Sequence, residues 1–319
     1  MCAPLVSVVI PSFCHEKYVA DTIRSVIEQT YQNIELIIID DGSSDHTWDK
    51  ILDLLPECKK RFVNVVAKTK RHAGICDSLN MASELLNGEY VTIIASDDVA
   101  KPYMISSLLS FLVKNPDFGL AVGNNEIIDK HGKKCGWDLA CNCAYTKSEL
   151  VYPTFVDWLK KNNPRINPTN FGTYATFCVG NYIPNGYLIR RSIFDHALPF
   201  PNKIQLEDWY LHLQLSKYCR YKYVDQILLS YRWHDTNTIK KLRSHSKQTI
   251  REVLVQELRI VKNEPGFNKI FGENARLHKT YFQITKYFRL YKTPCRLILQ
   301  IGAKKLTLSI CHNGLYDIS

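Results

Sequence analysis

The chain has 319 residues, of which 45% are hydrophobic and 23% are charged. This composition is typical of a globular protein with a substantial core, and it excludes a mainly disordered chain. The net charge of +10 is unevenly spread, because residues 240–319 carry 16 Lys and Arg against 5 Asp and Glu, whereas residues 1–239 carry 25 against 26. We therefore expect a near-neutral region followed by a basic one.

The N-terminal stretch MCAPLVSVVIPSF has no basic leader and passes directly into a strand-like run, so we do not expect a signal peptide. Apolar runs such as 297–301 are far shorter than the ~20 residues that span a bilayer. We expect a cytoplasmic protein whose eleven cysteines are reduced. The closest group, Cys135, Cys141 and Cys143, lacks the paired spacing of zinc sites, which favours ordinary thiols.

Strand-like and helix-like segments alternate over the first hundred residues. The strand-like runs are 5–10, 34–40, 62–67 and 90–95, and the helical segments are 16–30, 45–55 and 74–86. This alternation predicts an α/β fold with a Rossmann-like, mainly parallel sheet flanked by helices. Polar residues follow three of the strands, in PSFCHE, DDGSSD and SDD. Because ligands bind at the carboxyl ends of parallel strands, we expect these residues to line one site.

The second part of the chain mixes regular and irregular segments. We expect a helix at about 102–114, a strand at 119–129, a helix at 153–161, a strand and then a helix within 182–194, an amphipathic helix at 205–218 and an extended pair at 221–234. The remainder of 131–177 reads as a long irregular connection, which is typical of a functional loop. From about 238 the pattern is basic and helical, so we expect a C-terminal helical extension.

Taken singly, the acidic motifs have ordinary structural explanations. A DD pair after a strand is equally typical of a capping turn. Glu207 and Asp208 suit the start of a helix through its dipole, and a lone histidine such as His234 is most often structural.

In their order along the chain, however, the motifs resemble a family-2 glycosyltransferase of the GT-A fold, of the inverting type found in bacterial surface-polysaccharide synthesis. The resemblance covers residues 6–238 and is carried by VSVVIPSFCHEKYVADTIRSVIEQTYQNIELIIIDDGSSD, GICDSLNMASELLNGEYVTIIASDD, LEDW and YRWHDTNT. It implies a catalytic domain at 1–239, with a donor half at about 1–110 and an acceptor half at about 111–239. The basic amphipathic extension at 240–319 follows.

The resemblance also implies a donor site for a nucleoside-diphosphate sugar, with uridine preferred as the base. Asp41 matches the family carboxylate that accepts a hydrogen bond from the base, and an acceptor-only group suits an imide N–H. Pro11 and Glu16 lie on the loop that lines the same pocket. Arg71 offers a planar guanidinium to phosphate oxygens, with surface solvation as an equal alternative.

The SDD motif at 96–98 matches the family's metal-binding motif. The resemblance implies that Asp98 binds Mn²⁺ or Mg²⁺ and that Asp97 contacts the ribose or the sugar. Hard divalent ions prefer oxygen ligands and bridge protein carboxylates to phosphates. His234 is implied to lie near the diphosphate or the metal.

Asp208 matches the general base that takes the proton from the acceptor hydroxyl, and Glu207 is implied to assist it or to bind the acceptor. One base and in-line attack give inversion. Cys14 and His72 depart from the asparagines common in the family, which affects details of donor contact. The segment QILLSYRW does not have the QxxRW spacing of processive synthases, so we expect one sugar to be added at a time.

The tail segment 279–305 combines basic, aromatic and aliphatic residues at near-helical spacing. It is a candidate for an anionic membrane surface, with packing onto the catalytic domain and nucleic-acid binding as alternatives. A membrane surface suits a glycan acceptor carried on a polyprenyl diphosphate, which is inferred from family habit. We expect a peripheral enzyme on the cytosolic face of the inner membrane, without a nucleic-acid partner.

Two other functional classes remain open at this point. A catalytically idle GT-A-fold binding protein would have no chemical reason to retain Asp41, Asp98 and Asp208 together. A sugar nucleotidyltransferase needs a glycine-rich basic loop after the first strand, which IPSFCHEKY does not provide. A dinucleotide-dependent dehydrogenase is disfavoured because no G-x-G-x-x-G follows a strand.

Overall fold

The computed structural model describes residues 3–162, 170–177, 180–202, 204, 206–237, 240, 253 and 257, and the backbone of 296–301, 304–311 and 314–318. The chain forms two compact units, Met1–Thr249 and Ile250–Ser319, and each is described by itself. Among the described residues, no helix has both the length and the apolar character needed to cross a bilayer. The division of the catalytic region into donor and acceptor halves stays a prediction.

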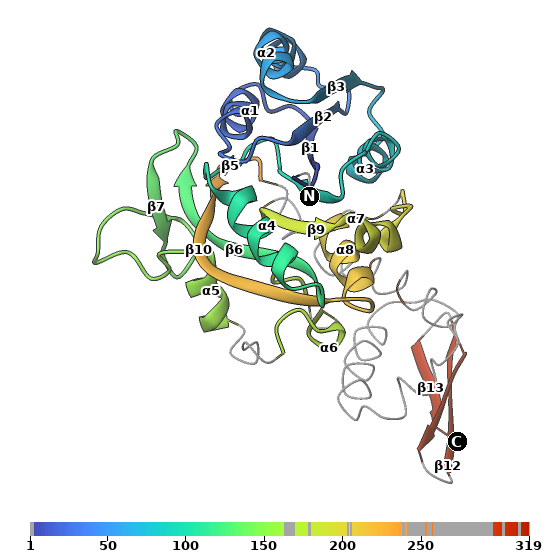
Figure 1. Ribbon diagram of the computed structural model, residues 1–319. Coiled ribbons are helices and arrows are strands. Elements are labelled where there is room, and N and C mark those ends of the chain that lie inside the picture. The colour runs from blue at the N-terminus through green and yellow to red at the C-terminus, as the bar shows by residue number, and fades with distance from the viewer. Residues whose placement is uncertain are drawn as a thin grey trace. The chain divides into compact units, whose positions relative to one another are not determined.

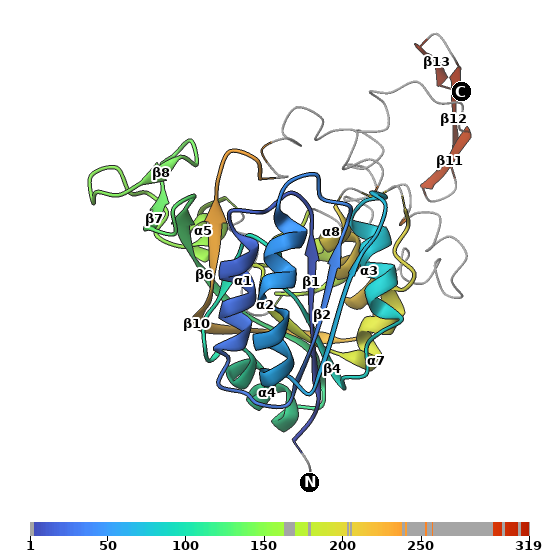
Figure 2. The same ribbon diagram turned by 90° about the horizontal axis from the view of Figure 1, so that it is seen from above.

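The first half of the larger unit is a parallel sheet, as the sequence predicts. Its strands lie in the order β3-β2-β1-β4 and are all parallel. The elements are β1 (Val6–Ser12), α1 (Val19–Ile27), β2 (Ile34–Asp40), α2 (Thr47–Arg61), β3 (Asn64–Thr69), α3 (Ile75–Ser83) and β4 (Tyr90–Ile93). The helices α1 and α2 lie side by side on one face of the sheet and α3 covers the other (Figures 1 and 2). Every residue of β2 is buried, because apolar strands covered on both faces have no side toward water.

The sheet continues through strands that break the parallel pattern. Beyond β4 the order is β9, β6, β10 and β5, with β9 antiparallel to both of its neighbours and β10 parallel to β6. The elements are β5 (Val99–Ala100), α4 (Met104–Lys114), β6 (Phe118–Asp129), β9 (Tyr187–Arg190), α7 (Arg191–Phe194), the 3-10 helix η1 (Asp195–Ala197), α8 (Glu207–Leu215) and β10 (Arg220–Trp233). The predicted α/β architecture is therefore confirmed, with a mixed rather than wholly parallel sheet.

The predicted extended pair at 221–234 is wrong, because this segment belongs to one continuous strand, β10. The polar residues Asp225 and Gln226 interrupt the apolar pattern of this segment. In the structure they fall where the register between β10 and β6 shifts, between Tyr223 and Ile227. A bulge accommodates such a break in an apolar pattern without ending the strand.

The helix predicted at 205–218 forms as α8, but it is not amphipathic. All residues from Trp209 to Leu215 are buried, including the polar His212 and Gln214. The ring of His212 stacks on Phe177 and its Nδ1 lies 3.2 Å from the Tyr221 hydroxyl. Burial lowers the pKa of His212 to about 3, so this side chain is a neutral part of the core.

The segment predicted as a long irregular connection contains more regular structure than expected. A hairpin of β7 (Lys134–Trp137) and β8 (Cys143–Ala144) extends from β6, and it is followed by α5 (Phe155–Asn162) and α6 (Tyr174–Phe177). The helix α5 confirms the prediction for 153–161. Trp137 on β7 packs with Trp233 on β10, at 5.0 Å between ring centroids, so the hairpin has an aromatic core of its own. Residues 163–169 lie outside the described part of the chain.

The predicted helical extension is wrong for 296–318, which form an antiparallel sheet. Its strands are β11 (Arg296–Ile301), β12 (Lys304–Cys311) and β13 (Gly314–Ile318). Apolar residues alternate with polar ones at Leu306, Leu308 and Ile310, and only two residues separate successive strands; both features are typical of hairpins. The rest of the predicted membrane-binding segment, 279–295, lies outside the described residues.

Candidate functional site

The two aspartates that follow β2 have different surroundings. Asp40 is 1% exposed, and its carboxylate accepts hydrogen bonds from the Ser43 backbone N–H at 3.1 Å and from the Thr69 hydroxyl at 2.9 Å. These contacts close the turn and tie β2 to β3. Asp40 is therefore a structural residue, whereas its neighbour Asp41 faces the loop at 70–74.

The carboxylate of Asp41 is held by this loop from β3 to α3. It accepts hydrogen bonds from the backbone N–H groups of Ala73 at 2.9 Å and Gly74 at 2.8 Å, and it forms an ion pair with Lys70. Burial alone would raise the pKa of Asp41, but the Lys70 ammonium and the two N–H donors outweigh it and hold the pKa below its ordinary value. Gly74 adopts φ +96°, a conformation that suits glycine at this turn of the loop. Asp41 is an ionised acceptor at neutral pH.

An aromatic pair lies beside Asp41. The rings of Phe13 and His72 are stacked with centroids 4.3 Å apart and planes 17° apart, and Phe13 is 43% exposed. His72 Nδ1 is 2.8 Å from an Asp41 oxygen. Sequence reasoning did not identify Phe13. The signal available was an aromatic residue in the polar loop after the first strand, where an exposed ring needs a partner or a ligand.

The other predicted donor residues are distributed around this region. Pro11 lies in β1 opposite Ile39, and Glu16 accepts a hydrogen bond at 3.0 Å from the His46 backbone N–H, so it caps the turn before α2. Arg71 is exposed on the 70–74 loop next to Lys70. Pro11, Glu16 and Arg71 stay predicted donor contacts.

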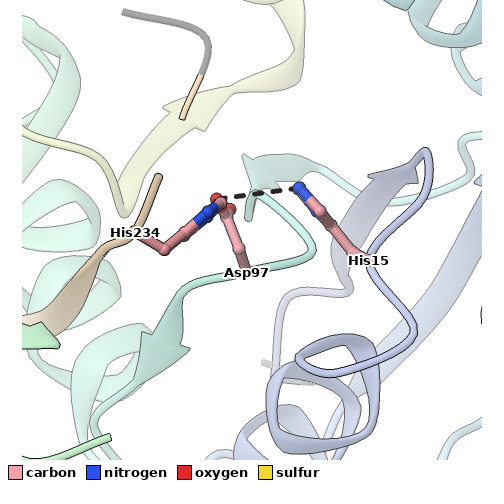
Figure 3. A group of neighbouring side chains, drawn as sticks. All are labelled: His15, Asp97 and His234. Atoms are coloured by element: carbon pink, nitrogen blue, oxygen red, sulfur yellow. Dashed lines mark hydrogen bonds and ion pairs between the residues drawn. The ribbon is translucent and has the colours of Figure 1, made fainter. Parts of the chain in front are cut away.

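The loop after β4 brings Asp97 to two histidines from distant parts of the chain (Figure 3). Asp97 Oδ2 is 2.9 Å from His234 Nε2, after β10, and 4.0 Å from His15 Nε2, after β1. One ligand atom from each of the three lies within 4.8 Å of the others. The opposite ring nitrogens are anchored, His15 Nδ1 at 2.8 Å from the Ser96 hydroxyl and His234 Nδ1 at 2.9 Å from the Thr236 hydroxyl. Second contacts of this kind orient imidazoles toward a metal, so the residues present fit a divalent cation.

Asp98 has different partners from Asp97. Its side chain is fully buried, with Oδ1 accepting from the Arg232 backbone N–H at 3.0 Å and Oδ2 accepting from Asn185 at 2.8 Å. Burial, followed by the charge of Asp97, raises the pKa of Asp98 well above its ordinary value. Because both oxygens are engaged by protein donors, the geometry favours Asp97 over Asp98 as a metal ligand.

A structural role for Asp98 has a measurable consequence. Asp98→Ala leaves the Arg232 N–H and the Asn185 amide without their acceptor, so we expect the free energy of unfolding to fall by about 1–3 kcal/mol. Urea denaturation measures this loss. The exposed Asp53→Ala on α2 is the matched control, with an expected change within about 0.5 kcal/mol. Equal stability of the two variants would mean that Asp98 does not hold the site together.

Glu207 and Asp208 begin α8, and both side chains are half-buried. Asp208 Oδ1 accepts from the Trp209 N–H at 2.7 Å, and Oδ2 accepts from the Asn181 amide at 2.7 Å. Burial raises the pKa of Asp208 despite these donors. Burial and the charge of Asp208 raise the pKa of Glu207 to about 8. The pair therefore has the character of an acid and a base side by side.

Tyr231 is a further titratable group near these carboxylates. It lies on β10, one residue before Arg232. Burial is the main reason that the pKa of the Tyr231 hydroxyl lies well above its ordinary value, and the charges of Asp98, Asp97 and Asp208 raise this pKa further. The hydroxyl thus lies in the field of the carboxylates that follow β4 and of the one that begins α8.

Two asparagines on one short segment donate hydrogen bonds to Asp208 and Asp98. Asn181 binds Asp208, and Asn185, four residues later, binds Asp98. Sequence reasoning missed His15, Tyr231 and both asparagines. The asparagines lie in NYIPNG, an irregular segment before a short strand, and their partners are not adjacent in sequence. The available signal was the pair of amide residues that flanks Pro184 in this segment.

Solved structures share this fold. The mannosyltransferase PcManGT from Pyrobaculum calidifontis, in complex with GDP-Man and Mn²⁺, matches with a TM-score of 0.58 at 14% identity, over 92% of this chain and 77% of that one. TarS from S. aureus, in complex with UDP-GlcNAc, matches with a TM-score of 0.54 at 14% identity, over 89% of this chain and 81% of that one. The architecture is that of a GT-A glycosyltransferase.

Curated relatives agree with this class. An uncharacterized glycosyltransferase of Haemophilus influenzae is 27% identical over 271 residues, which are 83% of this chain and 76% of the relative. The Escherichia coli protein WfgD, a UDP-Glc:alpha-D-GlcNAc-diphosphoundecaprenol beta-1,3-glucosyltransferase, is 33% identical over 127 residues, 40% of this chain and 48% of the relative. Two Rickettsia relatives are longer, since the chain spans 37% and 36% of their lengths.

The model of glycosyl transferase family 2 matches residues 7–182, which is more than half of the chain. The chain therefore belongs to glycosyl transferase family 2 and is an enzyme that transfers a glycosyl group. The family and the GT-A fold implied by the sequence motifs are both confirmed.

Proposed function

We propose that this glycosyltransferase is a metal-dependent, inverting and non-processive enzyme. It moves one sugar from a nucleoside-diphosphate sugar, with a UDP-sugar as the first candidate, to a hydroxyl of a glycan acceptor. The observation that carries the proposal is the short segment 181–185, on which Asn181 donates to Asp208 and Asn185 donates to Asp98, the neighbour of Asp97. Asp97 lies with two histidines that suit a cation. Burial raises the pKa of Asp208, as suits a general base.

The donor base is assigned to the region of Asp41, Phe13 and His72. An ionised, acceptor-only carboxylate suits the imide N–H of uracil. The exposed face of the stacked rings offers a planar surface beside it. The UDP-GlcNAc complex of TarS and the UDP-Glc specificity in the name of WfgD support the uridine preference.

This assignment predicts a selective loss of nucleotide affinity in Phe13→Leu. Removing the ring should weaken UDP binding by roughly threefold to tenfold without lowering the melting temperature, because Phe13 is exposed. Titration calorimetry with Mn²⁺ present measures it. Tyr218→Leu is the matched control, since Tyr218 is also an exposed ring stacked on a histidine, His196, at 3.8 Å. Equal affinities in the two variants would remove Phe13 from the donor site.

The cation is assigned to His15, Asp97 and His234, with Asp98 as the structural support behind Asp97. Two imidazoles and a carboxylate suit Mn²⁺ better than Mg²⁺, which prefers all-oxygen surroundings. A bound cation supplies electrostatic stabilisation of the departing diphosphate. The Mn²⁺ in the PcManGT complex supports this choice.

Asp208 performs the proton transfer. Its carboxylate accepts the proton of the acceptor hydroxyl while the oxygen attacks the anomeric carbon on the face opposite the diphosphate. One displacement of this kind inverts the anomeric configuration, so an α-linked donor gives a β-linked product. Glu207, with a pKa of about 8, carries a proton at neutral pH and donates a hydrogen bond to the acceptor or to Asp208.

The acceptor is proposed to be a glycan on a polyprenyl diphosphate, as in surface-polysaccharide and O-antigen synthesis. The diphosphoundecaprenol acceptor in the name of WfgD supports this class. The excess of Lys and Arg in 240–319 suits attraction to anionic lipid, and it supports the proposal of a peripheral enzyme on the cytosolic face of the inner membrane.

A panel of sugar nucleotides tests the proposal. Thermal shift with and without Mn²⁺ should show stabilisation by UDP-sugars that depends on the metal, because a ligand that binds only the folded state raises the melting temperature. Stabilisation by guanosine nucleotides alone would contradict the uridine assignment. A lack of stabilisation by every sugar nucleotide would contradict the proposed function.

A further inference from the structure

The side chain of Asn181 is fixed at both ends of its amide. Its Nδ2 donates to Asp208 Oδ2 at 2.7 Å, and its Oδ1 accepts from the Ile183 backbone N–H at 3.1 Å. Because the amide oxygen is engaged by the Ile183 N–H, the amide nitrogen is the end that faces Asp208. An oxygen in that position would repel the carboxylate. Asn181 therefore presents an N–H donor to Asp208 in a defined direction.

Burial opposes the ionisation of Asp208, and its neighbours on other elements are titratable groups. Glu207 precedes it on α8, and the phenols of Tyr187 on β9 and Tyr231 on β10 lie within its field. Cys76 on α3 faces Glu207, and burial and that carboxylate raise the pKa of its thiol to about 12. The Trp209 N–H and the Asn181 amide both donate to the Asp208 carboxylate.

The Trp209 N–H that donates to Asp208 lies in the first turn of α8, and the Trp209 side chain is itself held by a hydrogen bond. The Trp209 indole Nε1 donates to the Phe177 carbonyl oxygen at 2.7 Å, which fixes the first turn of α8. This backbone contact holds one oxygen of Asp208. The second oxygen depends on a side chain from outside the helix, and that side chain is Asn181.

We propose that Asn181 is a positioning residue that keeps the Asp208 carboxylate charged and fixes its orientation for proton transfer. The inference rests on the proposed role of Asp208 as the base. Asn185, on the same short segment, donates to Asp98, so this segment also fixes the base relative to the strand end that carries Asp97. The segment acts as a spacer between the proton-transfer and donor parts of the site.

The direct test measures the ionisation of Asp208 without substrate. Protein labelled with ¹³C at the aspartate carboxyls is titrated by NMR, and Asp208→Asn identifies the Asp208 signal. In Asn181→Leu, which has a similar volume but no donor, we expect the pKa of Asp208 to rise, because the hydrogen bond that favours its charged form is lost. In Asn181→Asp, a second carboxylate should raise it further. Asn142→Leu is the matched control, because Asn142 donates to Asp138 at 3.1 Å on the exposed β7–β8 turn.

A second measurement separates this inference from the proposed function. The acid limb of the pH profile for sugar-nucleotide turnover should move to higher pH in Asn181→Leu and further in Asn181→Asp. Mn²⁺-dependent binding of UDP should stay unchanged in both variants, which shows that they are folded. An unshifted Asp208 signal, or a uniform loss of rate with an unmoved acid limb, would overturn the role of Asn181. A shifted signal with full activity in Asp208→Asn would instead remove Asp208 as the base.

Discussion

Asp208→Asn is expected to lower kcat for sugar transfer by on the order of 10²–10⁴-fold while leaving the affinity for UDP largely unchanged. The reason is that an amide cannot accept the proton of the acceptor hydroxyl, whereas the donor site of Asp41 and Asp97 is built from other elements. Steady-state kinetics measures kcat, and titration calorimetry with UDP and Mn²⁺ measures the donor affinity. The expected result is a loss in kcat that is not matched by a loss in binding.

The pH profile of the wild-type enzyme is an independent test of Asp208 as the base. Because burial raises the pKa of Asp208, the ionised base is lost as pH falls through that raised value, and activity should decrease on the acid side at a higher pH than for an ordinary aspartate. Glu207→Gln keeps a hydrogen-bond donor beside Asp208 and serves as the comparison. Full activity of Asp208→Asn would show that the base lies elsewhere.

Removal of one ligand from the His15–Asp97–His234 group is expected to weaken Mn²⁺ binding by at least about tenfold. Asp97→Asn should have the largest effect, because it removes the negative charge, and His234→Ala should follow, because Nε2 of His234 is only 2.9 Å from the carboxylate. Titration of free Mn²⁺ by electron paramagnetic resonance measures the affinity without any substrate.

The metal prediction has two matched comparisons. His131→Ala removes an exposed histidine and should leave Mn²⁺ binding unchanged. Asp98→Asn tests the neighbouring carboxylate, and we expect it to retain more of the Mn²⁺ affinity than Asp97→Asn because both Asp98 oxygens already accept protein hydrogen bonds. The reverse order would assign the ligand to Asp98, as the sequence motif implied.

Local patterns were sufficient for the parallel half of the sheet. The runs at 34–40 and 90–95 are mainly apolar and lead into polar residues, and both features depend only on neighbouring positions. The positions of Asp41 and of the SDD motif at strand ends follow from the same alternation. Sequence order and periodicity therefore predicted where the site lies.

The different roles proposed for Asp97 as a metal ligand and Asp98 as a structural residue could not be predicted from the local sequence. The two residues are adjacent, and their roles are set by contacts with Arg232 and Asn185, which are distant along the chain. The same holds for the burial of α8, whose polar His212 is covered by residues from other elements. Tertiary contacts of this kind have no signature in a single sequence, whereas the alternation in β12 was visible and was outweighed by the basic, aromatic pattern before it.

The dependence of UDP binding on the divalent cation tests the central claim most directly. Titration calorimetry of the wild-type chain with UDP, in Mn²⁺ and again after chelation by EDTA, requires neither the sugar nor the acceptor to be known. We predict binding in Mn²⁺ and a loss of most of that affinity in EDTA, with Asp97→Asn behaving in Mn²⁺ as the wild type does in EDTA. UDP binding of equal strength under both conditions would contradict a cation held by His15, Asp97 and His234.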